Sequence, residues 1–152
     1  MSGVEHGSFT LTRELKAPVA MVFKAWADPD AKARWFNPPV GVTNVVREQD
    51  FRIGGRDRFK ATWPEGRTTD FQCEYRDIVE NECIVYVYDM HIDARKISVS
   101  LATLLFEKTK SGTKLTVTEQ GTFLNFYVDA GARERGTSDL LDALVRSVEK
   151  PS

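Results

Sequence analysis

The sequence predicts an α+β domain in which a curved antiparallel sheet of seven strands wraps around a long C-terminal helix, with two short helices after the first strand. Two patterns support this class. Apolar side chains recur with the period of strands over residues 42–123 and at helical spacing over residues 129–150. A chain of 152 residues fits one domain, placed at residues 9–149 after an N-terminal tail of residues 1–8.

Composition argues against several classes of protein. Lys and Arg number 21 against 22 Asp and Glu, so no field of one sign attracts a nucleic acid, and we expect no nucleic-acid partner. Residues 1–8 lack the apolar core of a signal peptide, and Leu101–Phe106 is too short an apolar run to cross a bilayer. We therefore expect a cytoplasmic protein with no membrane partner. Cys73 and Cys83 are too few to staple a fold and are expected to be reduced.

The residues before position 40 predict one strand and two short helices. Apolar and polar residues alternate over 9–15, which indicates a strand that ends at Ala17-Pro18. A helix follows Pro18 and ends before Asp28, which is suited to cap a second helix with Pro29 at its first position. The second helix leads to Trp35 and Phe36. The apolar face of the first helix comprises Val19, Val22, Phe23 and Trp26.

Five turn signals divide residues 42–123 into six further strands. Residues 64–66 and 110–112 predict three-residue loops that end on Gly, whereas residues 80–81 and 94–95 predict two-residue loops. Loop length fixes which residues face each other, so these choices set the register of four hairpins. The signals are Gly54-Gly55, Pro64-Glu65-Gly66, Glu80-Asn81, Ala94-Arg95 and Lys110-Ser111-Gly112.

That register places three rows of side chains on one face of the sheet. The first row is apolar and comprises Phe59, Phe71, Met90, Val99 and Phe123. The second comprises Asp57, Cys73, Tyr88, Leu101 and Gly121, and the third comprises Tyr75, Tyr86, Thr103 and Glu119. The opposite face is predicted to be mostly polar, with Arg58, Gln72, Glu74, Asp89, Ser98 and Thr118. Aromatic cross-strand pairs within these rows stabilise a sheet by roughly 0.2–1 kcal/mol each.

A long amphipathic helix is predicted over residues 129–150, and we expect it to cover the apolar face of the sheet. A bend in the sheet should leave space beneath this helix near the third row. The apolar stripe of the helix comprises Leu140, Leu141, Leu144, Val145 and Val148. The residues largely off the stripe are Arg133, Glu134, Asp142, Arg146 and Glu149.

Glu119 is the main candidate for a functional residue, because the register places its carboxylate on the apolar face. An unpaired charge there costs several kcal/mol, so the group should be hydrogen-bonded, paired with a cation or protonated. Tyr86, Tyr75 and Thr103 are expected within reach. Glu119 is then either a polar anchor or proton-transfer group in an apolar pocket, or a rim residue bound to water or to an Arg of the helix.

Other candidates have simpler interpretations. Asp57 lies just after Gly54-Gly55, where strands commonly bend, and is expected to be solvated. Trp35 and Phe36 are either gates for a ligand or core residues, with the core favoured. Cys73 faces inward and is favoured as a small buried hydrophobe over a reactive thiol.

The sequence lacks the residues that a histidine metal site, a phosphate-binding loop or a catalytic triad requires. Only His6 and His91 are available, one in the predicted tail and one at a strand end, which supports neither a histidine metal site nor a Ser-His-Asp relay. Gly54-Gly55 is not followed by a helix and does not predict a phosphate cradle. We therefore expect no metal and no cofactor.

Several short sequence motifs occur along these predicted elements. They are Ala17-Pro18, Val22–Trp26, Asp28-Pro29, Trp35-Phe36, Ile53–Gly55, Ile84–Tyr86, Ser98–Thr103 and Gly112–Gly121. In this order they resemble the START-like superfamily of polyketide cyclases and lipid-transfer domains, in the branch named for the activator of the Hsp90 ATPase. The resemblance runs from about Phe9 to Val148. It implies a helix-grip fold with a cavity between the sheet and the long helix. Many relatives have Gly-Trp where this chain has Gly136-Thr137, which removes a bulky side chain.

The resemblance does not imply one activity, because the superfamily includes ligand carriers, cyclases, stress-related proteins and chaperone activators. Binding or transport of a small hydrophobic or aromatic molecule is favoured, since it requires no catalytic machinery. A cyclase- or hydratase-type enzyme would use Glu119 and Tyr86. The predicted ligand contacts are Trp35, Phe36, Phe59, Phe71, Tyr75, Tyr86, Tyr88, Met90, Leu101, Thr103, Glu119 and Phe123.

Interaction with another protein is the third alternative. A stress-related, chaperone-activating module needs an exposed apolar patch, whereas the outer face of the sheet is predicted to be mostly polar. A homodimer is left open, because the edge strands are not visibly protected by Pro or bulges.

Overall fold

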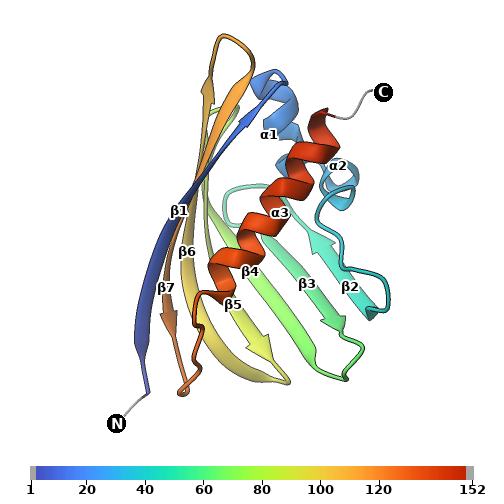
Figure 1. Cartoon of the computed structure of the whole chain (residues 1–152), viewed down its shortest axis with the longest axis vertical. Coiled ribbons are helices and arrows are strands. Elements are labelled where there is room, and N and C mark those ends of the chain that lie inside the picture. Colours follow the sequence, from blue (N-terminus) through green and yellow to red (C-terminus); the bar gives the residue numbers. More distant parts are fainter. Residues whose placement is uncertain (1–2, 150–152) are drawn as a thin grey trace.

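The computed structural model describes residues 3–149 of the chain and confirms the helix-grip architecture. An antiparallel sheet curves around the long helix α3 (Ala132–Glu149), which crosses its concave face, and two short helices stand at one end (Figure 1). The seven strands have the order β1-β7-β6-β5-β4-β3-β2, so β1 and β2 form the two edges. The remaining elements are β1 (Glu5–Leu15), α1 (Val19–Ala27), α2 (Pro29–Ala33), β2 (Thr43–Gln49), β3 (Arg56–Thr62), β4 (Thr68–Val79), β5 (Cys83–Ile92), β6 (Arg95–Lys108) and β7 (Thr113–Phe123).

The two short helices begin where the sequence predicts. Pro18 directly precedes α1, and Pro29 is the first residue of α2. The Asp28 carboxylate accepts a hydrogen bond from the N–H of Ala31 at 2.9 Å, so it satisfies one of the free donors at the start of α2. The apolar face of α1 packs into the core through Val22, Phe23 and Trp26, with Val19 partly buried beside it.

Helix α3 buries the predicted apolar stripe against the sheet. Leu141 and Leu144 are fully enclosed, and Leu140, Val145 and Val148 pack against the core around them. The opposite side of the helix is solvated, as its polar residues predict. Lys150, the predicted last residue of the helix, lies outside the described residues.

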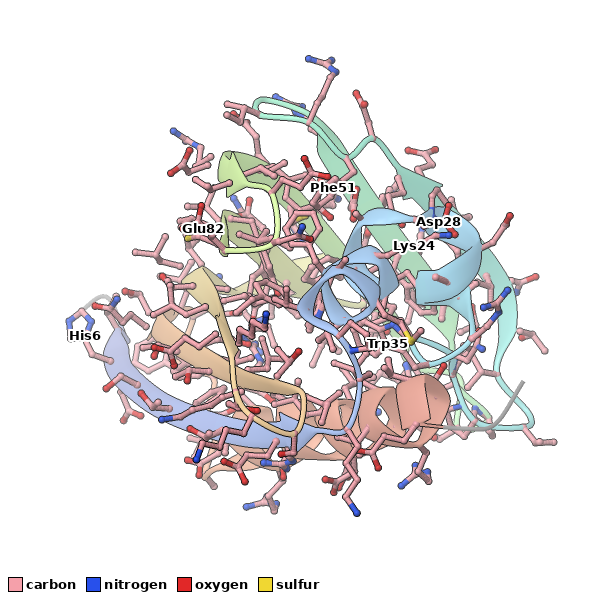
Figure 2. All side chains as sticks on the ribbon, turned by 90° about the horizontal axis from the view of Figure 1, so that it is seen from above. His6, Lys24, Asp28, Trp35, Phe51 and Glu82 are labelled. Carbon is pink, nitrogen blue, oxygen red and sulfur yellow. The ribbon has the colours of Figure 1, made fainter. Side chains whose placement is uncertain are left out.

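The first strand begins earlier than predicted. β1 starts at Glu5 instead of Phe9, so residues 5–8, expected in a tail, pair with β7. Gly7 stands opposite Gly121 and Ser8 opposite Gln120. The alternation signal is weak here because this part of the strand has few apolar side chains. Figure 2 shows His6 at the outer margin of the molecule, near the start of β1.

The predicted register is confirmed across β3, β4 and most of β5. Phe59 faces Phe71, and Tyr75 faces Tyr86. The turn between β4 and β5 has three residues instead of the predicted two, and a bulge at Arg76 of β4 offsets the extra residue. Neither change moves a side chain of the three predicted rows on these strands.

The predicted orientation of β6 is wrong by one residue. The turn before it is Asp93-Ala94, both with positive φ, instead of Ala94-Arg95, and a further register shift follows at Met90 and His91 of β5. A one-residue slip exchanges the two faces of a strand. Hence Val99, Leu101 and Thr103 face outward, and Ser98, Ser100 and Ala102 take their places in the three inner rows.

The register of β7 is nevertheless correct, because a second deviation offsets the first. The connection between β6 and β7 spans residues 109–112, one residue more than predicted. As a result Glu119, Gly121 and Phe123 remain on the inner face.

The slip in β6 changes the character of the outer face. Val99, Leu101 and Leu105 are 40%, 36% and 43% exposed, so this face carries an apolar strip that the sequence did not predict. The strip continues on β5, where Val87 stands opposite Leu101. The expectation of a mostly polar outer face is therefore wrong for β5 and β6.

Aromatic side chains fill the space between the sheet and the helices. Trp35 is 3% exposed, its indole N–H donates to the carbonyl of Ala25 at 2.9 Å, and it lies well inside the molecule in Figure 2. Phe36 packs edge-on against Phe59 with ring centroids 5.3 Å apart. Trp35 is therefore a core residue, the alternative that the sequence favoured, and Phe36 packs partly buried against the core. No helix between residues 3 and 149 has the length and apolarity that a bilayer crossing requires.

Candidate functional site

A row of small residues hollows the inner face of the sheet near its β1 edge. Gly7, Gly121 and Ser100 stand side by side on β1, β7 and β6. The neighbouring rows carry larger groups, with Phe123 on one side and the pair Phe9 and Glu119 on the other. Two glycines and a serine between two rows of large side chains leave a cavity on this face of the sheet.

This cavity has a volume of about 250 Å³ and lies under the beginning of α3. The residues of its floor are buried or half-buried, and most residues of its mouth are exposed. The floor comprises Ser100, Glu119, Gly121, Phe123 and Arg133. The mouth comprises Glu5, His6, Gly7, Ser8 and Phe9 of β1 together with Asp129, Ala130, Gly131 and Glu134.

Glu119 lies at the floor, 6% exposed, and both of its oxygens accept hydrogen bonds. The Tyr88 hydroxyl donates to Oε1, and the Thr137 hydroxyl donates to Oε2 at 3.4 Å. Of the expected states, the hydrogen-bonded one is therefore present.

Arg133 is the residue of the site that the sequence missed. It lies off the apolar stripe of α3 as predicted, yet its side chain turns inward instead of into solvent. Nη1 donates to the hydroxyls of Tyr88 at 2.9 Å and Ser100 at 3.2 Å, and Nη2 donates to Ser98 at 2.8 Å. The correct register of β6 would have revealed these two serines, but it depends on a bulge.

The guanidinium group of Arg133 also stacks on aromatic rings. It lies 5.4 Å from the ring centroids of both Tyr88 and Phe123. Within residues 3–149 Arg133 forms no ion pair, and its guanidinium group contacts three neutral hydroxyls and two aromatic rings. A cation in this setting can offer its remaining N–H groups to a polar ligand.

Arg133, Tyr88 and Glu119 form one hydrogen-bonded chain. Burial raises the pKa of the Glu119 carboxyl above its ordinary value of 4.5, while the Tyr88 hydrogen bond and the Arg133 charge oppose that rise. Burial and the neighbouring Glu119 charge raise the pKa of Tyr88, so its hydroxyl stays protonated. The chain can therefore present a donor or an acceptor at the floor.

Tyr86, the predicted partner of Glu119, is replaced in that role by Tyr88. The side chain of Tyr86 packs among other rings, 6.0 Å from Tyr75 and 6.4 Å from Phe71 between centroids. Burial raises its pKa as well. The structure thus brings Glu119 together with a tyrosine of the second row instead of the third.

Of the predicted ligand contacts, only Glu119 and Phe123 line the cavity, and Tyr88 bonds the two charged groups of its floor, Glu119 and Arg133. The others fall into two groups. Leu101 and Thr103 face outward, which corrects the predicted orientation. The aromatic core beside the cavity contains Trp35 and Tyr75, with Phe36, Phe71, Tyr86 and Met90 partly buried against it and Phe59 packed on Phe36.

Asp57, expected to be solvated, is 5% exposed and forms a second buried polar group. Lys32 of α2 donates to its Oδ2 at 3.1 Å, and the Tyr75 hydroxyl donates to the same oxygen. The N–H of Asp50 donates to Oδ1 at 3.1 Å. The prediction failed because the partner arrives from a helix distant in sequence. These contacts hold α2 against β3, and neither Asp57 nor Lys32 lines the cavity.

Cys73 is buried at 5% exposure beside this group. Burial and the Asp57 charge raise the pKa of its thiol to about 12. The thiolate is therefore scarce at neutral pH, in line with the prediction of a buried hydrophobe.

A second hollow of about 400 Å³ lies on the outer face, close to the turn between β5 and β6. Its carboxylate at Asp70 is already paired with Arg58 at 2.9 Å. The residues around it are Lys60, Thr68, Asp70, His91, Asp93 and Ala94. The cavity under α3 is the better candidate for a binding site, because the buried Glu119 and the inward-turned Arg133 meet at its floor.

The fold of this chain is shared by known proteins. The model of the activator of Hsp90 ATPase homolog 1-like family matches residues 16–149. The chain belongs to this family. Among solved structures, this family member is similar to an uncharacterized protein from Rhizobium leguminosarum, with 40% identity, 97% of each chain covered and a TM-score of 0.93. A protein from Rhizobium loti is 33% identical, with 95% of this chain and 98% of that chain covered and a TM-score of 0.88.

More distant family members share the fold alone. An AHSA1-like protein from Aeromonas hydrophila is 20% identical over 94% of this chain and 92% of that chain, with a TM-score of 0.68. No curated protein matches the sequence. The family is compatible with ligand binding and with Hsp90 ATPase activation.

Proposed function

We propose that this family member binds a small molecule with an apolar or aromatic body and at least one polar group in the cavity under α3. The observation that carries the proposal is the Arg133–Tyr88–Glu119 chain at the cavity floor. It supplies oriented donors and an acceptor next to the ring of Phe123. A pocket with apolar walls and a few convergent polar groups is the usual form of a small-molecule site.

The first experiment is native mass spectrometry of the freshly purified protein, followed by a thermal-shift screen of aromatic and hydrophobic metabolites. A ligand that binds only the folded state stabilises it by about 2.7 kcal/mol at 100 times its dissociation constant. A co-purified mass, or a reproducible shift with one chemical class, supports the proposal.

Filling the cavity tests its location. A Cβ at position 121 would lie 3.0 Å from the Ser100 Oγ, so Gly121→Ala places a methyl group on the floor. Gly136→Ala is the matched control, because a Cβ there meets nothing within 4 Å. We expect Gly121→Ala to weaken the ligand found in the screen about tenfold or more and Gly136→Ala to leave its affinity unchanged. Equal affinities would place the ligand elsewhere.

A proton-transfer enzyme is a second candidate, supported by the raised pKa of Glu119. Its acid–base pair is Glu119 with Tyr88 instead of Tyr86. Glu119→Gln keeps the size of the side chain and removes the titrating proton. If the ligand from the screen is converted by the wild type, the variant should bind it and leave it unchanged.

A chaperone-activating role is the third candidate. The apolar strip at Val99, Leu101 and Leu105 supports it, because such patches occur at protein interfaces. Capture of a chaperone that Leu101→Lys abolishes would favour this candidate over ligand binding.

A further inference from the structure

The N-terminal half of β1 is a free sheet edge that opens directly onto the mouth of the cavity. β1 is an edge strand of 11 residues, paired only with β7. The mouth is lined by five consecutive residues of this strand, Glu5–Phe9. Consecutive residues point to opposite faces of a sheet, so a hollow that touches all five runs along the edge itself.

Four hydrogen bonds define which backbone groups of β1 face this edge. The Lys16 N–H donates to Glu149 of α3 at 2.8 Å, and the Thr12 carbonyl accepts from Arg13 Nη1 at 3.0 Å. The Gly3 carbonyl instead accepts from the N–H of Phe126, which follows β7. Finally, the Leu124 N–H of the same segment donates to the carbonyl of Ile97 in β6, so the backbone N–H and C=O groups of the odd-numbered residues of β7 face β1.

Even-numbered residues of β1 therefore direct their N–H and C=O groups away from β7. Towards the end of the strand these groups have partners. The Thr12 carbonyl accepts from Arg13, whose side chain is bonded to Asp142 of α3, and the Lys16 N–H donates to Glu149 of α3. At His6 and Ser8 these groups have no partner among residues 3–149 and open onto the mouth. An uncovered edge of this kind pairs readily with another extended chain.

Charge around the mouth indicates what kind of chain fits. Glu5, Asp129 and Glu134 line it, and none of the three forms an ion pair within the described part of the chain. Arg133 is turned away towards the serines of β6. One cation also lies at the mouth, because Arg135 Nη1 donates to the Ala130 carbonyl at 3.1 Å. The three carboxylates outnumber this cation, and the excess of negative charge favours Lys or Arg side chains on the incoming segment.

We propose that the free edge of β1 at His6 and Ser8 binds an extended basic peptide segment of a partner protein by strand addition. The five residues Glu5–Phe9 span about 14 Å, which accommodates roughly four residues of an extended peptide. Its backbone pairs with the N–H and C=O groups of His6 and Ser8, and its basic side chains face Glu5 and Glu134. This interaction goes beyond the proposed ligand binding and does not require it, since it uses the mouth and not the floor.

The probe is acetyl-Val-Lys-Val-Lys-Val-N-methylamide, titrated into the ¹⁵N-labelled full chain. We expect saturable shifts of the His6 and Ser8 amide signals and slower hydrogen exchange at both. Two altered probes test the contributions of the backbone hydrogen bonds and of the Lys charges separately. N-methylation of the backbone nitrogens removes the donors, and replacement of both Lys by Glu reverses the charge. Each change should weaken binding about tenfold or more.

The protein side is tested with proline. Ser8→Pro removes an N–H that faces the edge and spares the bonds to β7, a position where edge strands tolerate proline. Thr12→Pro is the matched control, since it makes the same change on the same edge outside the mouth. We expect Ser8→Pro to weaken the peptide about tenfold and Thr12→Pro to leave its affinity unchanged. If Ser8→Pro does not fold, the N-methylated probe decides with the wild-type chain.

Three outcomes would overturn the proposal: no shift at His6 and Ser8 up to millimolar peptide, equal affinity for the N-methylated probe, or protection of both amides by self-association of the free protein. The last outcome would assign the edge to a second copy of the chain. Gly121→Ala should leave peptide binding unchanged. A loss of ligand binding in that variant with intact peptide binding separates the two proposals.

Discussion

The Tyr88 hydroxyl joins the two charged groups of the site, because it donates to Glu119 and accepts from Arg133. Its removal leaves the buried Glu119 carboxylate with Thr137 as its remaining, weaker partner, and it takes one of three acceptors from the Arg133 guanidinium, which keeps Ser98 and Ser100. Tyr88→Phe should therefore lower the free energy of unfolding by about 1–3 kcal/mol and raise the pKa of Glu119 further. Urea unfolding and ¹³C titration of the carboxyl measure the two effects. Tyr86→Phe is the matched control, since the Tyr86 hydroxyl has no hydrogen-bond partner among residues 3–149, and equal effects would contradict this role.

The raised pKa of Glu119 makes stability depend on pH. A native carboxyl that holds its proton more tightly than the unfolded one favours the folded state below the unfolded pKa, near 4.5. That contribution is lost as the pH rises through the native pKa. The stability of the wild type relative to Glu119→Gln should therefore fall over this window and level off above it. Urea unfolding of both proteins between about pH 4 and pH 8 provides the measurement, and a pH-independent difference would contradict the shift.

At the scale of elements, the buried pair of Lys32 and Asp57 holds α2 against β3. Removal of one partner leaves the other charge buried, so Lys32→Met should cost about 3–5 kcal/mol in unfolding free energy. Arg52→Met breaks an exposed pair with Asp50 at 2.9 Å and should cost less than about 1 kcal/mol. Urea unfolding compares the two. A small effect of Lys32→Met would mean that solvent reaches Asp57 readily.

Strand β6 offers a direct test of its register. Leu104 is fully buried and Leu105 is 43% exposed, whereas the register predicted from the turns places Leu105 inward. Leu104→Ala should cost about 2–5 kcal/mol, and Leu105→Ala should cost less than about 1 kcal/mol. Thermal or urea unfolding of the two variants separates the registers, because the predicted one requires the opposite order.

At the scale of the whole molecule, the closure of α3 and the short helices over the sheet isolates Cys73 from solvent. Its buried thiol, with a pKa of about 12, should react with a disulfide reagent only through large-scale opening. Cys83 is partly exposed and should react faster. Mass spectrometry of labelling in Cys83→Ala and Cys73→Ala variants follows one thiol at a time. Fast labelling of Cys73 under native conditions would show that the core opens locally.

Much of this architecture was predictable from local chemistry. The cap at Asp28 and the stripe of α3 each follow from the pattern of a few neighbouring residues. Pairing across β3 to β5 was predictable because turn length and aromatic alternation agree there. These features depend on a period or a turn, and both are visible in the sequence. The predicted inward position of Glu119 is correct because the deviations before and after β6 offset each other.

The tertiary structure alone decided the orientation of β6 and the composition of the site. A turn at Asp93-Ala94 carries no strong signature, and a bulge has no sequence period, so Ser98 and Ser100 could not be placed inward beforehand. Arg133 and Lys32 acquire their partners from strands distant in sequence. The sequence by itself determined which elements form and most of their faces, because those depend on short-range periodicity. Packing determined which polar groups meet, because a buried charge takes whichever partner the folded chain brings within reach.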